Sequence, residues 1–167
     1  DIPIRQHCCQ SGLEFARITG AYGMTPLEWM DALGVLNERM LLPHGEYVTG
    51  TRNVDRPGRD LDILKNSGAT LVHCPVVSGR HGGFMDSFSK FRDMGVRIGL
   101  GTDTWPPDFI QNMQVGMLLS RVTDGSIETV RSEHYFDAGT LGGADALRRP
   151  DLGRLQPGSK ADIIVID

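Results

Sequence analysis

Residues 96–103, Val-Arg-Ile-Gly-Leu-Gly-Thr-Asp, decide the fold, because a strand-sized apolar run gives way there to glycine, a hydroxyl and the carboxylate of Asp103. A helical pattern over residues 84–94 precedes this strand candidate, residues 96–101, and ends at Gly95. Earlier strand candidates with helical patterns between them are residues 2–7, 40–43 and 69–73. Strands that alternate with helices are typical of parallel β-α units, so the sequence predicts an α/β fold with a parallel sheet.

The helical patterns carry their own start and stop signals. Thr25 precedes Pro26 and is followed three positions later by Glu28, which predicts a capping box with proline in the first turn. The helices expected are residues 11–22, 26–33, 60–66, 84–94, 108–121, 126–133 and 138–148. Beyond Pro150 a Pro-Gly turn leads to an apolar run at residues 161–166, expected to be a fifth strand. We therefore divide the chain into residues 1–150 and a separate β-segment, residues 151–167.

Composition excludes several classes of protein. The chain has 167 residues and a formal net charge of -4, without the clustered basic residues of a nucleic-acid-binding protein. Its apolar runs are too short to cross a membrane. Three cysteines, two of them adjacent, do not form a disulfide framework and favour a reducing, cytoplasmic location. The chain begins inside a strand-like pattern without Met, so we expect it to be part of a longer protein.

Polar side chains stand where four successive strands end. His7, His44, His73 and Asp103 follow or close the four strand candidates. In a parallel barrel these ends form one face, which holds the active site. Imidazole and carboxylate together suit a metal such as zinc. A single histidine near a strand end is more often structural, so the prediction depends on all four positions occurring together.

Three motifs resemble the amidohydrolase superfamily, closest to its chlorohydrolase, aminohydrolase and cytosine-deaminase-like branch. Residues 99–103, Gly-Leu-Gly-Thr-Asp, resemble the family's eighth-strand motif, and residues 71–75, Leu-Val-His-Cys-Pro, its seventh-strand motif. Residues 153–167 resemble its C-terminal signature, G-x-L-x-P-G-x-x-A-D followed by four apolar residues and Asp. The resemblance implies the C-terminal half of a (β/α)8 TIM barrel, strands five to eight in sequence order, with extra C-terminal helices and one strand of a small β-domain.

The resemblance also implies a chemistry. Enzymes of this family hydrolyse C–N or C–halogen bonds of small, often ring-containing substrates with water activated by one zinc or iron ion. His7 matches the fifth-strand metal ligand, and Asp103 matches the eighth-strand ligand that also takes the proton from the water. His44 matches a catalytic histidine beside the water and the substrate. Gln10, Glu46 and His73, with His44, are the implied substrate contacts.

Two departures from the family pattern bear on activity. The family's first-strand H-x-H metal ligands are absent, and Gln10 occupies the position where many relatives carry a proton-shuttling glutamate. Glu14 and Glu46 are possible substitutes. We therefore expect the chain alone to be inactive and to hold zinc or iron incompletely or not at all.

Two alternatives remain open at this stage. The chain could be a non-catalytic, self-associating half-barrel, since the open strand edges of half a barrel predict a homo-oligomer. It could also be an unrelated α/β domain. The family requires the four strands side by side in sequence order, whereas a doubly wound sheet does not.

Overall fold

Four parallel strands lie side by side in chain order in the computed structural model, which describes residues 2–166. They are β1 (Ile4–Arg5), β2 (Met40–Pro43), β3 (Thr70–His73) and β4 (Arg97–Leu100). Leu42 pairs with Leu71, and Leu71 pairs in turn with Ile98. The order β1-β2-β3-β4 confirms the predicted arrangement and excludes the doubly wound alternative.

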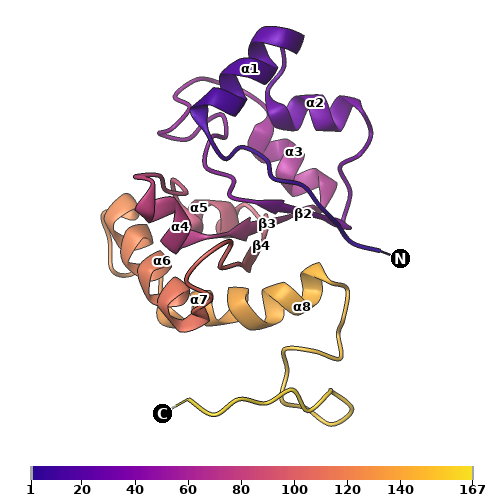
Figure 1. Cartoon of the computed structure of the whole chain (residues 1–167), viewed down its shortest axis with the longest axis vertical. Helices are drawn as coiled ribbons and strands as arrows, with labels where there is room; N and C mark the ends of the chain where they lie inside the picture. Colours follow the sequence, from indigo (N-terminus) through magenta and orange to yellow (C-terminus); the bar gives the residue numbers. More distant parts are fainter. Residues whose placement is uncertain (1, 167) are drawn as a thin grey trace.

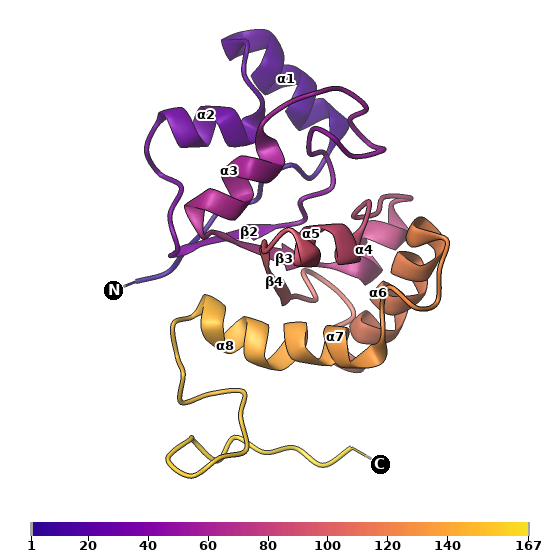
Figure 2. The ribbon, with the colours of Figure 1, turned by 180° about the vertical axis from the view of Figure 1, so that it is seen from behind.

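Helices flank this sheet on two sides. Figures 1 and 2 show α1 (Gly12–Tyr22), α2 (Pro26–Ala32) and α3 (Asp60–Ser67) grouped beyond the β1–β2 side of the sheet. The β4 side carries α6 (Phe109–Asp124), α7 (Ser132–Asp137), the π-helical segment η1 (Ala138–Gly142) and α8 (Gly143–Ala146). Two short helices, α4 (Pro75–Arg80) and α5 (Phe88–Asp93), lie between β3 and β4 in the sequence. The capping box predicted at Thr25 and Glu28 is present.

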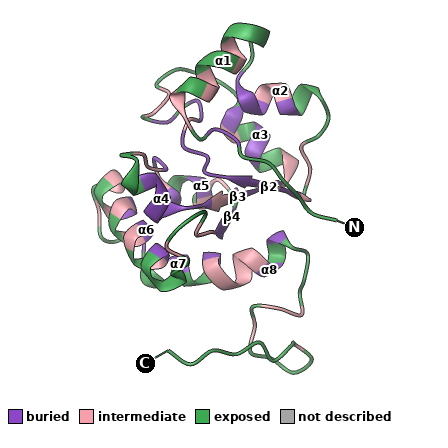
Figure 3. Cartoon of the chain, in the orientation of Figure 1, coloured by how far each residue is buried: buried purple, intermediate pink, exposed green. Residues whose placement is uncertain are grey.

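The core lies between the strands and the helices that cover them. Leu42, Leu71 and Ile98, which occupy one register row of the sheet, are buried together with Leu64 of α3 and Phe91 of α5. Figure 3 shows the buried residues concentrated along the sheet, while the outer surfaces of α1 and the tail are exposed. Burial of these apolar side chains holds the helices onto the strands.

Several element predictions need correction. The strand expected at residues 161–166 is wrong: these residues form no strand and are exposed, because no neighbouring strand pairs with them. The helix expected at residues 126–133 begins only at Ser132, and the helix expected at 138–148 is divided between η1 and α8. The segment 75–80 forms α4, which was not expected. Among the described residues, no helix has the length and apolar character needed to cross a membrane.

Candidate active site

The carboxyl ends of the strands carry the candidate site. His44 directly follows β2 and bridges to Cys8, whereas Asp103 stands three residues beyond β4. Both residues have left-handed backbone conformations, with φ of 84° at His44 and 57° at Asp103. Residues other than glycine adopt this region at a cost, and such strained positions cluster at functional sites. In a strand, successive side chains point to opposite faces of the sheet. The left-handed turns take the side chains of His44 and Asp103 out of this regular alternation.

Three of the predicted residues come together. The rings of His7 and His44 stack with their centroids 5.2 Å apart, and His44 Nε2 lies 3.9 Å from Asp103 Oδ2. The His44 side chain is fully buried, whereas Asp103 retains 19% of its side-chain exposure and His7 is exposed. These three residues, predicted separately from three strands, form the centre of the site.

The surroundings of His44 lower the pKa of its imidazole. Burial lowers its pKa, the carboxylate of Asp103 opposes that shift, and the neighbouring His7 adds to it. Neither ring nitrogen of His44 has a hydrogen-bond partner among the described residues. A neutral imidazole offers one donor and one acceptor, and leaving both unpaired in a buried position is costly. The geometry therefore favours a polar group bound beside His44.

His73 lies near His44, but its ring packs into the core. Its ring is buried against Phe88 of α5 and Tyr135 of α7, with centroid separations of 6.5 Å and 6.0 Å. Burial, followed by the nearby His44, lowers the pKa of His73 to about 3. Its side chain is therefore an uncharged part of an aromatic cluster, although its position in the sequence is equivalent to those of His7 and His44.

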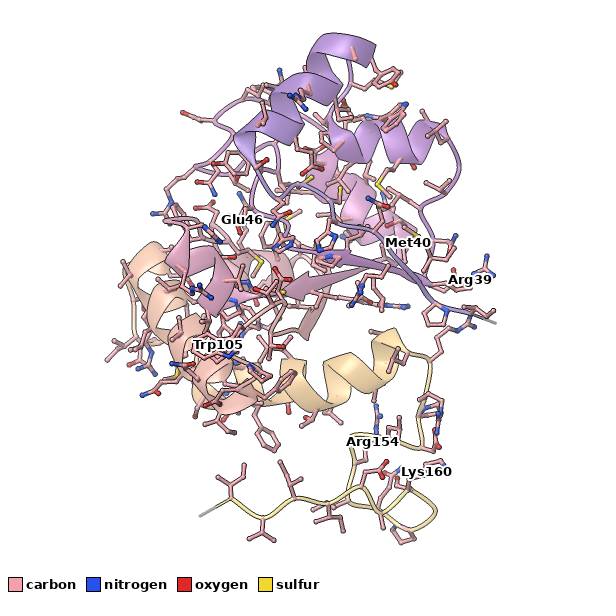
Figure 4. The ribbon with its side chains drawn as sticks, viewed as in Figure 1. Arg39, Met40, Glu46, Trp105, Arg154 and Lys160 are labelled. Carbon is pink, nitrogen blue, oxygen red and sulfur yellow. The ribbon has the colours of Figure 1, made fainter. Side chains whose placement is uncertain are left out.

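The carboxylates of the two glutamates near the site, Glu46 and Glu14, already accept hydrogen bonds within the protein. Glu46 is buried and its Oε1 accepts a 2.5 Å hydrogen bond from Ser78 of α4, while burial raises the pKa of its carboxyl group. Figure 4 shows Glu46 beside α4, near this end of the sheet. Glu14 accepts hydrogen bonds from the backbone N–H groups of Cys9 and Gln10. Glu14 therefore holds the turn after β1, and the Gln10 side chain stays exposed.

Sequence reasoning assigned no role to two neighbours of the site. Ser78 was assigned no role, yet it is the hydrogen-bond partner of Glu46. Cys74 is buried, and burial, with the negative charges of Asp103 and Glu46, raises the pKa of its thiol to about 12. The Cys74 thiol is therefore protonated and unreactive at neutral pH. The signal in the sequence was its place in the Leu-Val-His-Cys-Pro motif, residues 71–75.

The side chains of His7, His44 and Asp103 are of the types that bind metal ions, but they provide only some of the ligands that a metal site needs. Imidazole and carboxylate are suitable ligands for zinc, and the unpaired nitrogens of His44 lie beside them. Among the described residues, however, no three His, Cys, Asp or Glu side chains are grouped so that they could hold a metal ion. The residues present therefore provide only part of a metal site.

Comparison with known proteins defines the class to which this fold and site belong. The family model "Amidohydrolase family" matches residues 1–167, so the chain belongs to the amidohydrolase family. The 5-methylthioadenosine/S-adenosylhomocysteine deaminase of Pyrococcus furiosus is 29% identical over 100% of this chain and 39% of its own length. The enzyme of the same name from Thermococcus sibiricus is 31% identical over 96% of this chain and 37% of its own length.

Solved structures show the same fold. An adenosine deaminase from Xanthomonas campestris with bound zinc matches 96% of this chain and 36% of that structure, with a TM-score of 0.85 and 24% identity. A zinc complex of atrazine chlorohydrolase from Arthrobacter aurescens matches with a TM-score of 0.82 and 23% identity, over 96% of this chain and 35% of that one. The chain thus spans about two fifths of the relatives that it matches, consistent with part of a TIM barrel.

Proposed function

We propose that this chain is the C-terminal part, strands five to eight, of a metal-dependent hydrolase that cleaves C–N or C–halogen bonds of a small, ring-containing molecule. The observation that carries the proposal is the cluster at the strand ends, where buried His44 stacks on His7 and lies 3.9 Å from Asp103. Membership of the amidohydrolase family and the names of its relatives support the reaction class.

In this proposal His7 and Asp103 would hold the metal, zinc or iron, with further ligands from outside residues 1–167. When bound, such an ion lowers the pKa of a coordinated water to about 7. The Asp103 carboxylate, beside His44, is positioned to accept a proton. His44 would donate a hydrogen bond to a polar substrate atom from its otherwise unpaired ring.

The proposed substrate contacts are His44 and Gln10. We leave His73 out, because its ring is enclosed by Phe88 and Tyr135. We also leave Glu46 out, because its buried carboxyl group is bonded to Ser78. Three free, buried cysteines agree with a reducing cytoplasm, which we propose as the location.

The test uses the full-length protein that carries these residues, loaded with zinc. Release of ammonia from adenosine and 5-methylthioadenosine, and of chloride from atrazine, measures the two bond classes. We expect Asp103→Ala to abolish turnover, His44→Ala to reduce kcat by about 100-fold, and Gln10→Ala to have much less effect. Asp62→Ala, an exposed site on α3, is the matched control. Near-normal turnover by Asp103→Ala would contradict the assignment of the base.

A second candidate function is non-catalytic self-association. The apolar tail residues Ile163, Ile164, Val165 and Ile166 are 56–95% exposed, and Ile4 of the edge strand β1 is 49% exposed. Unpaired edges and apolar runs of this kind invite pairing with another chain. We propose that residues 1–167 alone are inactive and form a homo-oligomer, of which a two-fold dimer is the simplest form. Residues 151–167 would then be the start of a β-segment that needs partner strands.

A further inference from the structure

The loop that joins β4 to α6, residues 101–108, starts at the carboxyl end of the sheet and carries Asp103 of the candidate active site. Two residues further on, Trp105 is 66% exposed. Figure 4 shows Trp105 at the same end of the molecule as Glu46, away from Met40, the first residue of β2. Packing in the core therefore does not account for this tryptophan.

The indole of Trp105 makes no ring contact and no side-chain hydrogen bond with another residue of the described part of the chain. The other tryptophan of the sequence, Trp29, is half-buried and stacks on Tyr22, with the ring centroids 4.5 Å apart and the planes at 12°. The exposed indole instead keeps a large apolar face in water. Covering this face with another flat ring is favourable, both through burial of apolar surface and through stacking.

The backbone that carries this indole is held in place on both sides. The guanidinium group of Arg80, at the end of α4, donates a 2.7 Å hydrogen bond to the carbonyl oxygen of Trp105. Asp108 caps the start of α6 with its side chain. The buried Asn112 then links α6 to α4, because its amide donates to the Asp108 carbonyl and accepts from the N–H of Val76. A free indole on a fixed backbone lowers the ordering cost of stacking on a ligand.

Trp105 lies within reach of the proposed reacting groups. One residue separates it from Asp103, so the two Cα atoms are at most about 7 Å apart. Asp103 Oδ2 lies 3.9 Å from Nε2 of His44, whose ring nitrogens have no hydrogen-bond partner among the described residues. The same α4 that holds the Trp105 carbonyl also holds Glu46, through Ser78. An uncovered aromatic face and unpaired polar atoms therefore border one end of the sheet.

We propose that Trp105 is a specificity-determining residue of the proposed hydrolase and that it selects substrates with a planar nitrogen heterocycle. Its indole would stack on one face of the substrate ring, while His44 and Asp103 face the edge of the ring at which the bond is cleaved. A flat heterocycle has apolar faces and a polar edge, so it satisfies both kinds of group at once, whereas an aliphatic amide satisfies only the polar ones. This inference rests on the proposed function, because it assigns the ring-binding part of the same site.

Steady-state kinetics of the full-length, zinc-loaded protein with adenosine and 5-methylthioadenosine test this role. We expect Trp105→Ala to raise KM about tenfold, the effect of losing one stacked aromatic side chain, with kcat within about twofold of the wild type. Trp105→Phe keeps an aromatic face and should restore most of the affinity. Leu33→Ala, 58% exposed at the end of α2, is the matched control and should change neither constant.

Two kinetic outcomes would overturn the proposal. One is an unchanged KM for Trp105→Ala. The other is a KM increase of the same size in Trp105→Phe, accompanied by a lower melting temperature in both variants, since that pattern would indicate a structural role for the side chain.

Tryptophan fluorescence separates ring binding from catalysis. The chain has two tryptophans, so Trp29→Phe leaves Trp105 as the only one and keeps an aromatic ring against Tyr22. We expect adenosine and melamine to quench this fluorescence in residues 1–167 in a saturable way, whereas ribose, which has no aromatic ring, should not. Absence of turnover by the full-length wild type would refute the proposed hydrolase and leave a saturable quench as support for stacking. No saturable quench up to about 10 mM of either ring compound would overturn the stacking itself.

Discussion

Replacing Asp60 should reveal the interaction that holds the α1–α3 region together. Asp60, the first residue of α3, is completely buried. Its Oδ1 accepts a 2.5 Å hydrogen bond from the Thr25 hydroxyl at the start of α2, and its Oδ2 accepts a 2.9 Å bond from the backbone N–H of Thr49. The Asp60 N–H donates in return to the Thr49 hydroxyl, at 3.3 Å. One carboxylate thus connects two helix starts to the loop that follows His44.

The size of the effect follows from these contacts. Hydrogen bonds to a charged group contribute about 1.5–3 kcal/mol each, and Asp60→Ala removes two of them. It also leaves the Thr49 N–H buried without its acceptor. Removal of a buried charge returns part of that loss, because the desolvation cost of the carboxylate disappears. We expect the free energy of unfolding to fall by about 3 kcal/mol, a large share of the stability of a typical domain, about 5–15 kcal/mol.

Urea denaturation followed by circular dichroism measures this change. With a slope of about 2 kcal/mol per molar urea, the midpoint of Asp60→Ala should shift down by about 1.5 M. Asp62→Ala controls for charge in the first turn of α3, because Asp62 is exposed, and should cost about 0.5 kcal/mol or less. A double-mutant cycle with Thr25→Val should give a coupling energy of about 1–2 kcal/mol. A loss below about 1 kcal/mol in Asp60→Ala would refute this reasoning.

Four further outcomes are expected. Gly142→Ala should destabilise the chain by about 2 kcal/mol, because its Cβ meets the Ile98 carbonyl oxygen, whereas Gly143→Ala, with open space around it, should stabilise it slightly. Because burial depresses the pKa of His73, the unfolded chain takes up the proton first below pH 6.5, and stability present at neutral pH is lost on acidification. Between pH 7 and pH 5 the wild type should therefore lose about 2 kcal/mol more than His73→Phe in urea titrations. Metal analysis of residues 1–167 after dialysis with zinc should give well below one equivalent, since no group of three ligands is present in the described part of the chain; a full equivalent would be contrary evidence. Light scattering at micromolar concentration should give a dimer, and a clean 18.3 kDa species would exclude it.

Local sequence signals predicted correctly those elements that are determined by interactions between residues close together in the chain. The capping box of Thr25 and Glu28 and the strand at residues 40–43 appear as predicted, because each depends on a few adjacent side chains. The strand expected at residues 161–166 fails for the opposite reason, since an apolar run becomes a strand only when a neighbour supplies hydrogen bonds. The start of α4 shows a missed signal: Pro75 at the first helical position favours a helix, but the glycines that follow indicated a loop.

The predictions for the candidate site also differ in outcome from residue to residue. The difference depends on where each residue lies relative to the end of its strand. His73 is the last paired residue of β3, opposite Leu100, so it shares a face with Leu71, two residues earlier, and that face is covered by helices. His44 and Asp103 lie beyond their strands, where left-handed turns redirect their side chains toward each other. His44 still pairs with Cys8, so its left-handed backbone, and not the end of the hydrogen-bonded ladder, takes its side chain out of the alternation of the strand. The sequence indicates the end of a strand to within a residue or two, and at this site one residue separates a buried core histidine from a histidine beside a carboxylate.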